Sequence, residues 1–159
     1  MPLSVNEVVA SDLCLGSEWE VANEPLLAEY VARIAVGQCR HVARILSSEG
    51  TSAAAVNQAA KADAIRLLTV GPGEEPWHRD GWLFQAISWV AAYSAGGAAI
   101  RPPHLIKAHK GFDGLKLELN DAGAVTAVII FEDKATDNPR KTIREEVWPG
   151  IEKLERGER

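Results

Sequence analysis

Two β-rich segments in the second half of the chain are separated by a short turn, and this pairing constrains the fold more than any other feature. Residues 115–119 alternate leucine with charged side chains, and residues 124–135 contain a long apolar run. Between them stands Asn-Asp-Ala-Gly at residues 120–123, and Asn, Asp and Gly all favour tight turns. The pattern predicts an antiparallel hairpin with Asp121 and Ala122 at its tip.

Charged residues flank this hairpin at its open end. With the predicted turn, Asp113 extends the first strand opposite Ile130, and opposed residues of an antiparallel pair point to the same face. Ile130, Glu132 and Lys134 alternate along the second strand, because side chains repeat with period two. We therefore expect Asp113, Glu132 and Lys134 to converge. A register shift of one residue would move Asp113 to the opposite face.

Two carboxylates beside a lysine suit metal-assisted hydrolysis of a phosphodiester bond. Mg²⁺ is typically held by one or two carboxylates and keeps several waters. The cation lowers the pKa of bound water and stabilises the charge that develops on the phosphate. Lys134 would orient or deprotonate the attacking water, or neutralise the phosphate as a compact charge. The residues therefore predict a Mg²⁺ site, in which Mn²⁺ can substitute for Mg²⁺.

The same residues resemble the motif of the PD-(D/E)xK nuclease superfamily. The match consists of Asp113, followed by Glu132, Asp133 and Lys134. The resemblance implies a restriction-endonuclease-like core, in which a small mixed sheet flanked by helices bears the motif, and a metal-dependent DNA endonuclease. It also implies that Asp113, Glu132 and the Asp133 carbonyl are metal ligands, with Lys134 as the catalytic lysine.

A narrower resemblance involves the sequence around the first acid. Residues 109–115 (HKGFDGL), with Phe131 to Lys134, are similar to the nuclease subunit of the Hachiman anti-phage defence system, which works beside a helicase. This implies DNA and a helicase as partners. Phe112 stands where the superfamily usually has proline, and Gln85 stands where many members carry a glutamate on the preceding helix. A missing third carboxylate would weaken a second metal site.

Helical periodicity dominates the first half of the chain. Apolar residues at helical spacing predict helices over residues 24–48, 51–70 and 80–93. The last of these is apolar almost all round and is expected to pack against the sheet. A fourth helix should begin at Asn138-Pro139, a capping residue followed by proline.

The fourth helix should kink or end at Trp148-Pro149-Gly150. A glycine-proline loop near residue 72 divides the chain. We therefore expect an α/β or α+β fold, with a helical N-terminal region, residues 1–76, and a nuclease core, residues 77–159. The resemblance calls for a further strand, so this core is expected to be incomplete at its C-terminal end.

Composition narrows the class of protein. A chain of 159 residues that is 47% hydrophobic and 25% charged is suited to a single core. No apolar run approaches the roughly 20 residues that span a bilayer, and the N-terminus has no basic start typical of a signal peptide. The two cysteines are too few for a disulfide framework or a zinc site. We expect a cytoplasmic protein that makes no membrane contact.

Overall charge argues against strong non-specific binding to nucleic acid, since the net charge is −5 and the pI is near 5.4. Basic residues nevertheless gather around the first acid and in the fourth helix. The candidates for phosphate contact are Lys107, His109, Lys110, Lys116, Arg140 and Arg144. Both groups can equally be solvated surfaces, because lysines protect strand edges and the arginines can pair with Glu145 and Glu146.

Two alternatives to an enzyme remain open. One is a non-catalytic subunit with a degenerate nuclease fold that binds a partner protein or nucleic acid, and the acidic pI and the absence of a helix carboxylate favour it. The other is a small nucleic-acid-binding module that uses the basic residues without cleaving. The intact set of Asp113, Glu132 and Lys134 favours a metal-dependent deoxyribonuclease.

Overall fold

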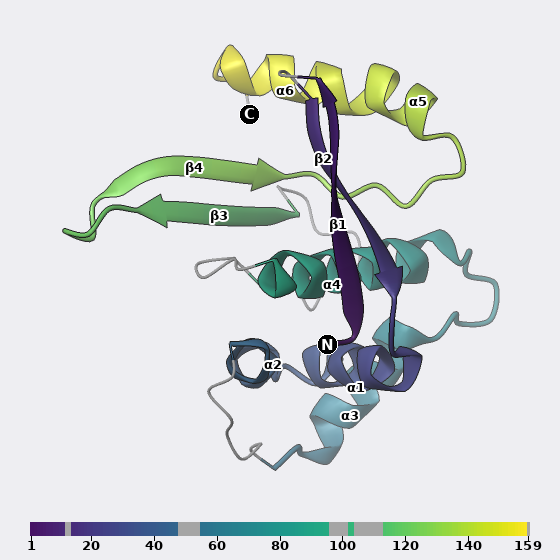
Figure 1. Ribbon diagram of the computed structural model, residues 1–159. Coiled ribbons are helices and arrows are strands. Elements are labelled where there is room, and N and C mark those ends of the chain that lie inside the picture. The colour runs from purple at the N-terminus through teal and green to yellow at the C-terminus, as the bar shows by residue number, and fades with distance from the viewer. Residues whose placement is uncertain (12–13, 48–54, 96–101, 104–112, 159) are drawn as a thin grey trace.

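The computed structural model describes residues 1–11, 14–47, 55–95, 102–103 and 113–158, and Figure 1 shows their arrangement. In chain order, the elements are β1 (Leu3–Ser11), β2 (Cys14–Val21), α1 (Glu24–Ala35), α2 (Cys39–Leu46), α3 (Gln58–Leu68), α4 (Trp77–Ser94), β3 (Gly114–Leu119), β4 (Val125–Phe131), α5 (Pro139–Thr142), the π-helical turn η1 (Ile143–Val147) and α6 (Trp148–Glu155). The described strands form two separate two-stranded antiparallel sheets, β1 with β2 and β3 with β4. The fold is therefore α+β.

The chain begins with a long β-hairpin. Strand β1 pairs with β2 from Leu3 opposite Val21 onward, and Figure 1 shows this hairpin crossing α4. Trp19 stands between two glutamates, so β2 has an apolar and an acidic face. The Trp19 ring packs against Phe84 of α4, with ring centroids 6.2 Å apart. The prediction of a helical N-terminal region is thus wrong for residues 3–11 and 14–21, which form strands.

The predicted helix over residues 24–48 is broken into α1 and α2. Helix α1 begins at Asn23, whose side chain accepts a hydrogen bond from the Leu26 N–H at 3.0 Å. It ends at Ala35, two residues before Gly37, which has a φ of 83°, a conformation that glycine adopts without steric cost. The Gly37 N–H donates to the Ile34 carbonyl at 2.9 Å, which closes the helix end in the manner of a glycine cap. The single-helix prediction is therefore wrong at this glycine.

The next two helices lie near their predicted positions. Helix α3 starts after Asn57, whose side chain accepts a hydrogen bond from the Ala60 N–H at 2.8 Å. It is shorter than the predicted span of residues 51–70, of which residues 51–54 lie outside the described part. Helix α4 confirms the prediction for residues 80–93 and extends it at both ends. None of the described helices combines the length and apolar character needed to cross a bilayer.

One apolar core joins α1, α2, α3 and α4 with the start of β1. Its buried residues are Leu3, Leu27, Tyr30, Val31, Ile34, Ala35, Cys39, Val42, Ala64, Leu67, Trp82, Ala86, Trp89, Val90 and Ala91. The core therefore crosses the boundary predicted between residues 76 and 77. Helix α4 turns much of its apolar surface toward the N-terminal elements and leaves another side facing the β3–β4 hairpin.

The β3–β4 hairpin forms as predicted, but with a different register. Leu115 lies opposite Ile130, whereas the predicted tip places Asp113 there, so the register differs by two residues. The turn explains the difference: the Asn120 N–H donates to the Ala124 carbonyl at 2.9 Å, Gly123 has a φ of 77°, and the pairing is irregular at the end of β3. Strand β4 is also shorter than the predicted span of residues 124–135. A shift of two residues leaves every side chain on its predicted face.

The last helical segment starts as predicted and continues past the three residues at which a kink or an end was predicted. The Asn138 side chain accepts a hydrogen bond from the Lys141 N–H at 3.3 Å. The segment does not end at Trp148–Gly150 but runs on to Glu155. The wide turn η1 ends at Val147, two residues before Pro149, where a proline would disrupt a regular α-helix.

Candidate active site

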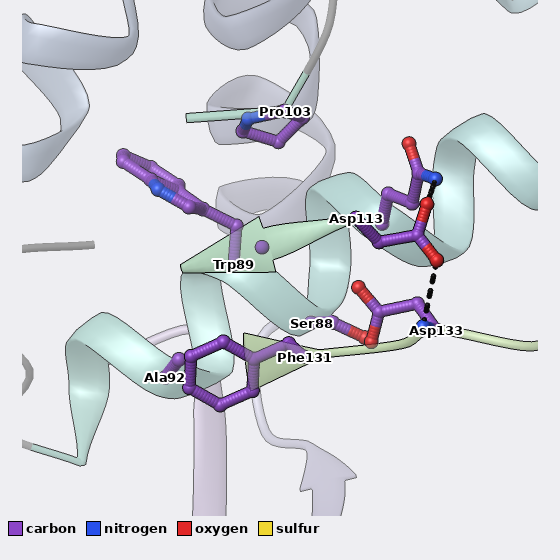
Figure 2. A pocket seen from close by; sticks show the side chains of 9 residues that line it. Ser88, Trp89, Ala92, Pro103, Asp113, Phe131 and Asp133 are labelled. Carbon is purple, nitrogen blue, oxygen red and sulfur yellow. Dashed lines mark hydrogen bonds between the residues drawn. The ribbon is translucent and has the colours of Figure 1, made fainter. Parts of the chain in front are cut away.

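Asp113 lies just before β3, with its carboxylate held from two sides. Oδ2 accepts a hydrogen bond from the Asp133 N–H at 2.8 Å, and Oδ1 accepts one from the Gln85 amide of α4. Figure 2 shows the carboxylate between α4 and the chain that leaves β4. Burial raises the pKa of Asp113, and the charge of Glu132 adds to the rise, although the Asp133 N–H opposes it. Two segments far apart in the sequence therefore fix the orientation of this carboxylate.

Glu132 and Lys134 form an ion pair next to Asp113. The Lys134 Nζ lies 2.9 Å from the Glu132 Oε1, and both side chains are partly buried. The other oxygen, Glu132 Oε2, is buried and has no hydrogen-bond partner. Burial alone would lower the pKa of Lys134, but the hydrogen bond and charge of Glu132, helped by the charges of Asp113 and Glu146, raise it. Lys134 is therefore a stable cation near neutral pH, and one oxygen of its partner lacks a donor.

The Asp133 side chain points away from this pair, toward α4. It accepts a hydrogen bond from Ser88, which partly offsets the burial that raises the pKa of Asp133 to about 6. Figure 2 shows the Asp133 carboxylate next to Ser88, with Phe131 further along the same cavity. The cavity is about 20 Å³, which is room for about one water. Asp133 thus donates its backbone N–H to Asp113, and the charge of the Asp113 carboxylate adds to the rise in the pKa of Asp133.

The structure brings together the three residues that the hairpin pattern predicts to converge. Extension of the observed register places Asp113 in line with Glu132, and charges on Glu132 and Lys134 both act on Asp113. Among the described residues, no three His, Cys, Asp or Glu side chains form a group that could hold a metal ion. Mg²⁺ needs only one or two carboxylates and completes its shell with water. Glu132 Oε2 has no donor and is therefore available to a hard cation, and Asp113 is near enough for the two carboxylate charges to interact.

The predicted phosphate-binding residues are more scattered. Lys116 stands an odd number of residues from Asp113, so it lies on the other face of the strand, where it pairs with Glu118 at 3.3 Å. Arg144 pairs with Glu145 at 2.8 Å, and Arg140 is exposed in α5. The remaining three candidates, Lys107, His109 and Lys110, lie outside the described residues. Of the predicted phosphate-binding residues that the structure describes, none therefore joins Lys134 at the site.

Ser88 and Glu146 were not predicted as part of the site, and Gln85 was named only as the residue that stands where many superfamily members carry a glutamate. Gln85 and Ser88 are polar residues three positions apart in a largely apolar stretch of α4, and this spacing places them on one helical face. That pattern is visible in the sequence and could have indicated a polar contact with the hairpin. Glu146 influences Lys134 from η1. Its approach depends on how the last helix packs, for which the sequence has no local signal.

Comparisons of this chain with protein-family models, with curated proteins and with solved structures found no match. Any functional assignment therefore depends on the chemistry of Asp113, Glu132 and Lys134 and of the groups that hold them.

Proposed function

We propose that this chain is a Mg²⁺-dependent deoxyribonuclease, an endonuclease with a restriction-endonuclease-like core. The observation that carries the proposal is the Glu132–Lys134 ion pair beside Asp113, in which Glu132 Oε2 is buried without a donor. A buried polar atom without a partner costs about 1–3 kcal/mol. A cation bound between the two carboxylates would remove this cost and the repulsion between them.

Each residue of the site has a distinct role in this proposal. Asp113 and Glu132 would hold Mg²⁺, with the Asp133 carbonyl as a further ligand, as the motif resemblance implies. When bound, the cation lowers the pKa of water and stabilises charge on the phosphate. Gln85 and the Asp133 N–H keep the Asp113 carboxylate oriented. Lys134 remains protonated and would neutralise a phosphate oxygen of the substrate.

DNA as the substrate, a helicase partner and a role in anti-phage defence belong to the same proposal. Their support is the resemblance of the motif to PD-(D/E)xK nucleases and to the Hachiman nuclease subunit. In addition, basic residues follow the site in α5 and η1, where a polyanion could reach them.

The direct test is cleavage of circular and linear DNA with Mg²⁺ or Mn²⁺, alone and with any co-encoded helicase. Glu132→Gln and Lys134→Ala should each reduce cleavage by about 10²–10³-fold, the usual loss for a removed transition-state charge contact. Glu118→Gln is the matched control, because Glu118 also pairs with a lysine two residues away on the same hairpin. A folded wild-type protein that cleaves under none of these conditions would refute the proposal.

DNA binding can be tested separately from cleavage. Arg140→Ala combined with Arg144→Ala should weaken DNA binding and reduce the salt dependence of the affinity by about two counterions. Fluorescence anisotropy over a range of salt concentrations measures both quantities. Unchanged affinity at low salt would show that these arginines are only a solvated helix face.

One observation favours a second candidate, the non-catalytic subunit that binds a partner protein or nucleic acid. The described hairpin and last helix expose several large apolar residues, including Val128, Trp148 and Ile151. Such surface is typical of binding sites. Partner binding that is independent of metal, together with absent cleavage, would identify this candidate. Metal-independent, salt-sensitive DNA binding would instead indicate a simple nucleic-acid-binding module.

A further inference from the structure

Helix α2 differs in charge from helices α1, α3, α4 and α6. Its sequence, Cys39–Leu46, contains Arg40, His41 and Arg44 and no acidic residue. The other four helices each contain at least one aspartate or glutamate. The net charge of the whole chain is −5, so a helix with two arginines and no acid is a local exception in an acidic protein.

The two arginines of α2 have no acidic partner in the part of the chain that the structure describes. Other described arginines form ion pairs with acids, and these are Arg33, Arg66, Arg79, Arg144 and Arg156. Arg40 and Arg44 take part in no such pair among the described residues, and both are exposed. Their guanidinium groups can therefore bind an anion without first breaking an internal contact.

Arg40 and Arg44 lie on one face of the helix. Residues four apart are neighbours on a helical surface, and a rise of 1.5 Å per residue separates them by about 6 Å along the axis. At the end of α1, Arg33 donates to Gln38 Oε1 at 3.3 Å and holds Glu29 in an ion pair at 2.7 Å. Glu29 is thus already paired and does not cancel the positive charge of α2.

The apolar residues of α2 are all engaged in the protein core. Cys39 and Val42 are buried, and Ala43, Ile45 and Leu46 pack against the buried residues. The helix therefore exposes no large apolar side chain. Protein interfaces are usually anchored by aromatic or other apolar residues, and a helix that lies on a membrane inserts its apolar face. A face with exposed arginines and no apolar anchor is better suited to the phosphate backbone of a nucleic acid, which is bound mainly through charge.

The basic face of α2 is separate from the candidate active site. Figure 1 shows α2 and the β3–β4 hairpin on opposite sides of α4. Asp113 lies between α4 and that hairpin, where Gln85 and the Asp133 N–H hold it. A nucleic acid on α2 would therefore be a different stretch from the one at Asp113.

We propose that the exposed face of α2, with Arg40 and Arg44, is a second binding site for the phosphate backbone of duplex DNA. The choice of DNA rests on the proposed function, whereas the affinity for phosphate rests on the two unpaired arginines. Each guanidinium can donate two parallel hydrogen bonds to a phosphate. Such contacts carry no sequence information, so the site binds DNA of any sequence while another stretch lies at Asp113.

Fluorescence anisotropy of the full chain with a labelled duplex tests this site, in EDTA so that no metal-dependent cleavage occurs. Arg40→Gln combined with Arg44→Gln should weaken binding about 10-fold and reduce the slope of log affinity against log salt by about two. The matched control is Arg66→Gln combined with Arg156→Gln, which removes the same charge from exposed arginines that are paired with acids. The control should change the affinity by less than about twofold. Unchanged affinity and salt slope in the α2 variant, or an equal loss in the control, overturns the proposal.

A second variant separates a lost charge from a damaged fold. Arg40→Lys combined with Arg44→Lys keeps both charges and should restore most of the affinity and of the salt slope. A lysine variant that binds as weakly as the glutamine variant overturns the proposal. Duplex RNA and anionic vesicles replace DNA in two further arms, and binding to either that needs Arg40 and Arg44 when DNA binding does not overturns DNA as the ligand.

The two proposals for this chain can fail independently. The α2 variants keep Asp113, Glu132 and Lys134 intact. DNA binding that depends on Arg40 and Arg44 in a protein that never cleaves would refute the nuclease proposal alone. Metal-dependent cleavage by a chain whose DNA affinity is unchanged in the α2 variant would overturn the α2 site alone.

Discussion

Replacement of Gln85 by glutamate perturbs the contact between α4, which carries Gln85, and Asp113 of the site. The Gln85 amide donates a hydrogen bond to Asp113 Oδ1. A glutamate of similar shape would place a second carboxylate against the first, with no proton between them at alkaline pH. The substitution therefore converts an attractive contact into a repulsive one while it keeps the volume of the side chain.

The size of the effect follows from that contact. The lost hydrogen bond to a charged group costs about 1.5–3 kcal/mol. Two charges about 4 Å apart repel by about 4 kcal/mol at an effective dielectric constant of about 20, and about half of this remains after allowance for solvent screening of the partly buried Asp113. We therefore expect Gln85→Glu to reduce the free energy of unfolding by about 4 kcal/mol at about pH 8.

The loss should depend on pH and on metal. At about pH 5 the new glutamate takes up a proton for about 1 kcal/mol and can then donate a hydrogen bond to Asp113, so the loss should shrink to about 1 kcal/mol. A divalent cation between the carboxylates should restore stability at high pH as well. Urea denaturation at both pH values, in EDTA and in Mg²⁺, measures these free energies.

The matched control is Gln58→Glu. Gln58 is exposed in the first turn of α3, where a negative charge is mildly favourable, so this variant should lose no stability at either pH. Two results would show that Gln85 does not contact the Asp113 carboxylate in the way described. One is a Gln85→Glu variant as stable as the wild type at about pH 8, and the other is a variant that loses as much stability at about pH 5 as at about pH 8.

Three further predictions concern stability. Gly114→Ala should reduce the free energy of unfolding in urea by about 1–3 kcal/mol, because a Cβ would lie 3.1 Å from the Phe131 ring. In the control Gly81→Ala, in α4, the new Cβ meets nothing within 4 Å, so the free energy of unfolding should rise by about 0.5–1 kcal/mol. The pKa of Asp133 is about 6 against a usual value of 3.8, so the folded metal-free chain binds that proton more tightly than the unfolded chain does. The free energy of unfolding should therefore fall by about 1–2 kcal/mol between about pH 4 and pH 7. Asp133→Asn should abolish that fall, and its persistence in the variant would assign it to other groups. Finally, about 10 mM Mg²⁺ should raise the Tm of the wild type by about 3–4 °C if its Kd is about 1 mM, and a similar rise in Glu132→Gln would contradict the metal site.

Periodicity in the sequence was enough to predict the β3–β4 hairpin and α4. Strand β4 is an uninterrupted apolar run after a turn rich in Asn, Asp and Gly, and α4 is a long apolar helix, so local preference and tertiary packing agree there. The convergence of Asp113 with Glu132 also survived a register error of two residues. It did so because side chains alternate with period two, and a shift by an even number preserves the face.

The features that the sequence did not predict depend on single residues or distant contacts. Gly37 breaks a pattern that is otherwise continuous from α1 into α2, because only its backbone conformation, and not its hydrophobicity, ends the helix. The N-terminal strands are stabilised by packing of Trp19 on Phe84, a contact between residues far apart in the sequence. The hydrogen bond from Gln85 to Asp113 also spans 28 positions, and no local pattern encodes its geometry.

The position of Asp113 gives it a structural role alongside the proposed chemical one. The β3–β4 hairpin contributes no buried residue to the apolar core, so polar contacts matter more for its attachment than they do for α1 or α3. Asp113 joins α4 to both ends of this hairpin, through Gln85 on one oxygen and the Asp133 N–H on the other. Asp113→Ala would remove both contacts and loosen the hairpin as well as any metal site, whereas Asp113→Asn keeps one acceptor. Lost cleavage in the alanine variant alone would therefore not identify Asp113 as a metal ligand, but lost Mg²⁺ stabilisation in a well-folded Asp113→Asn variant would.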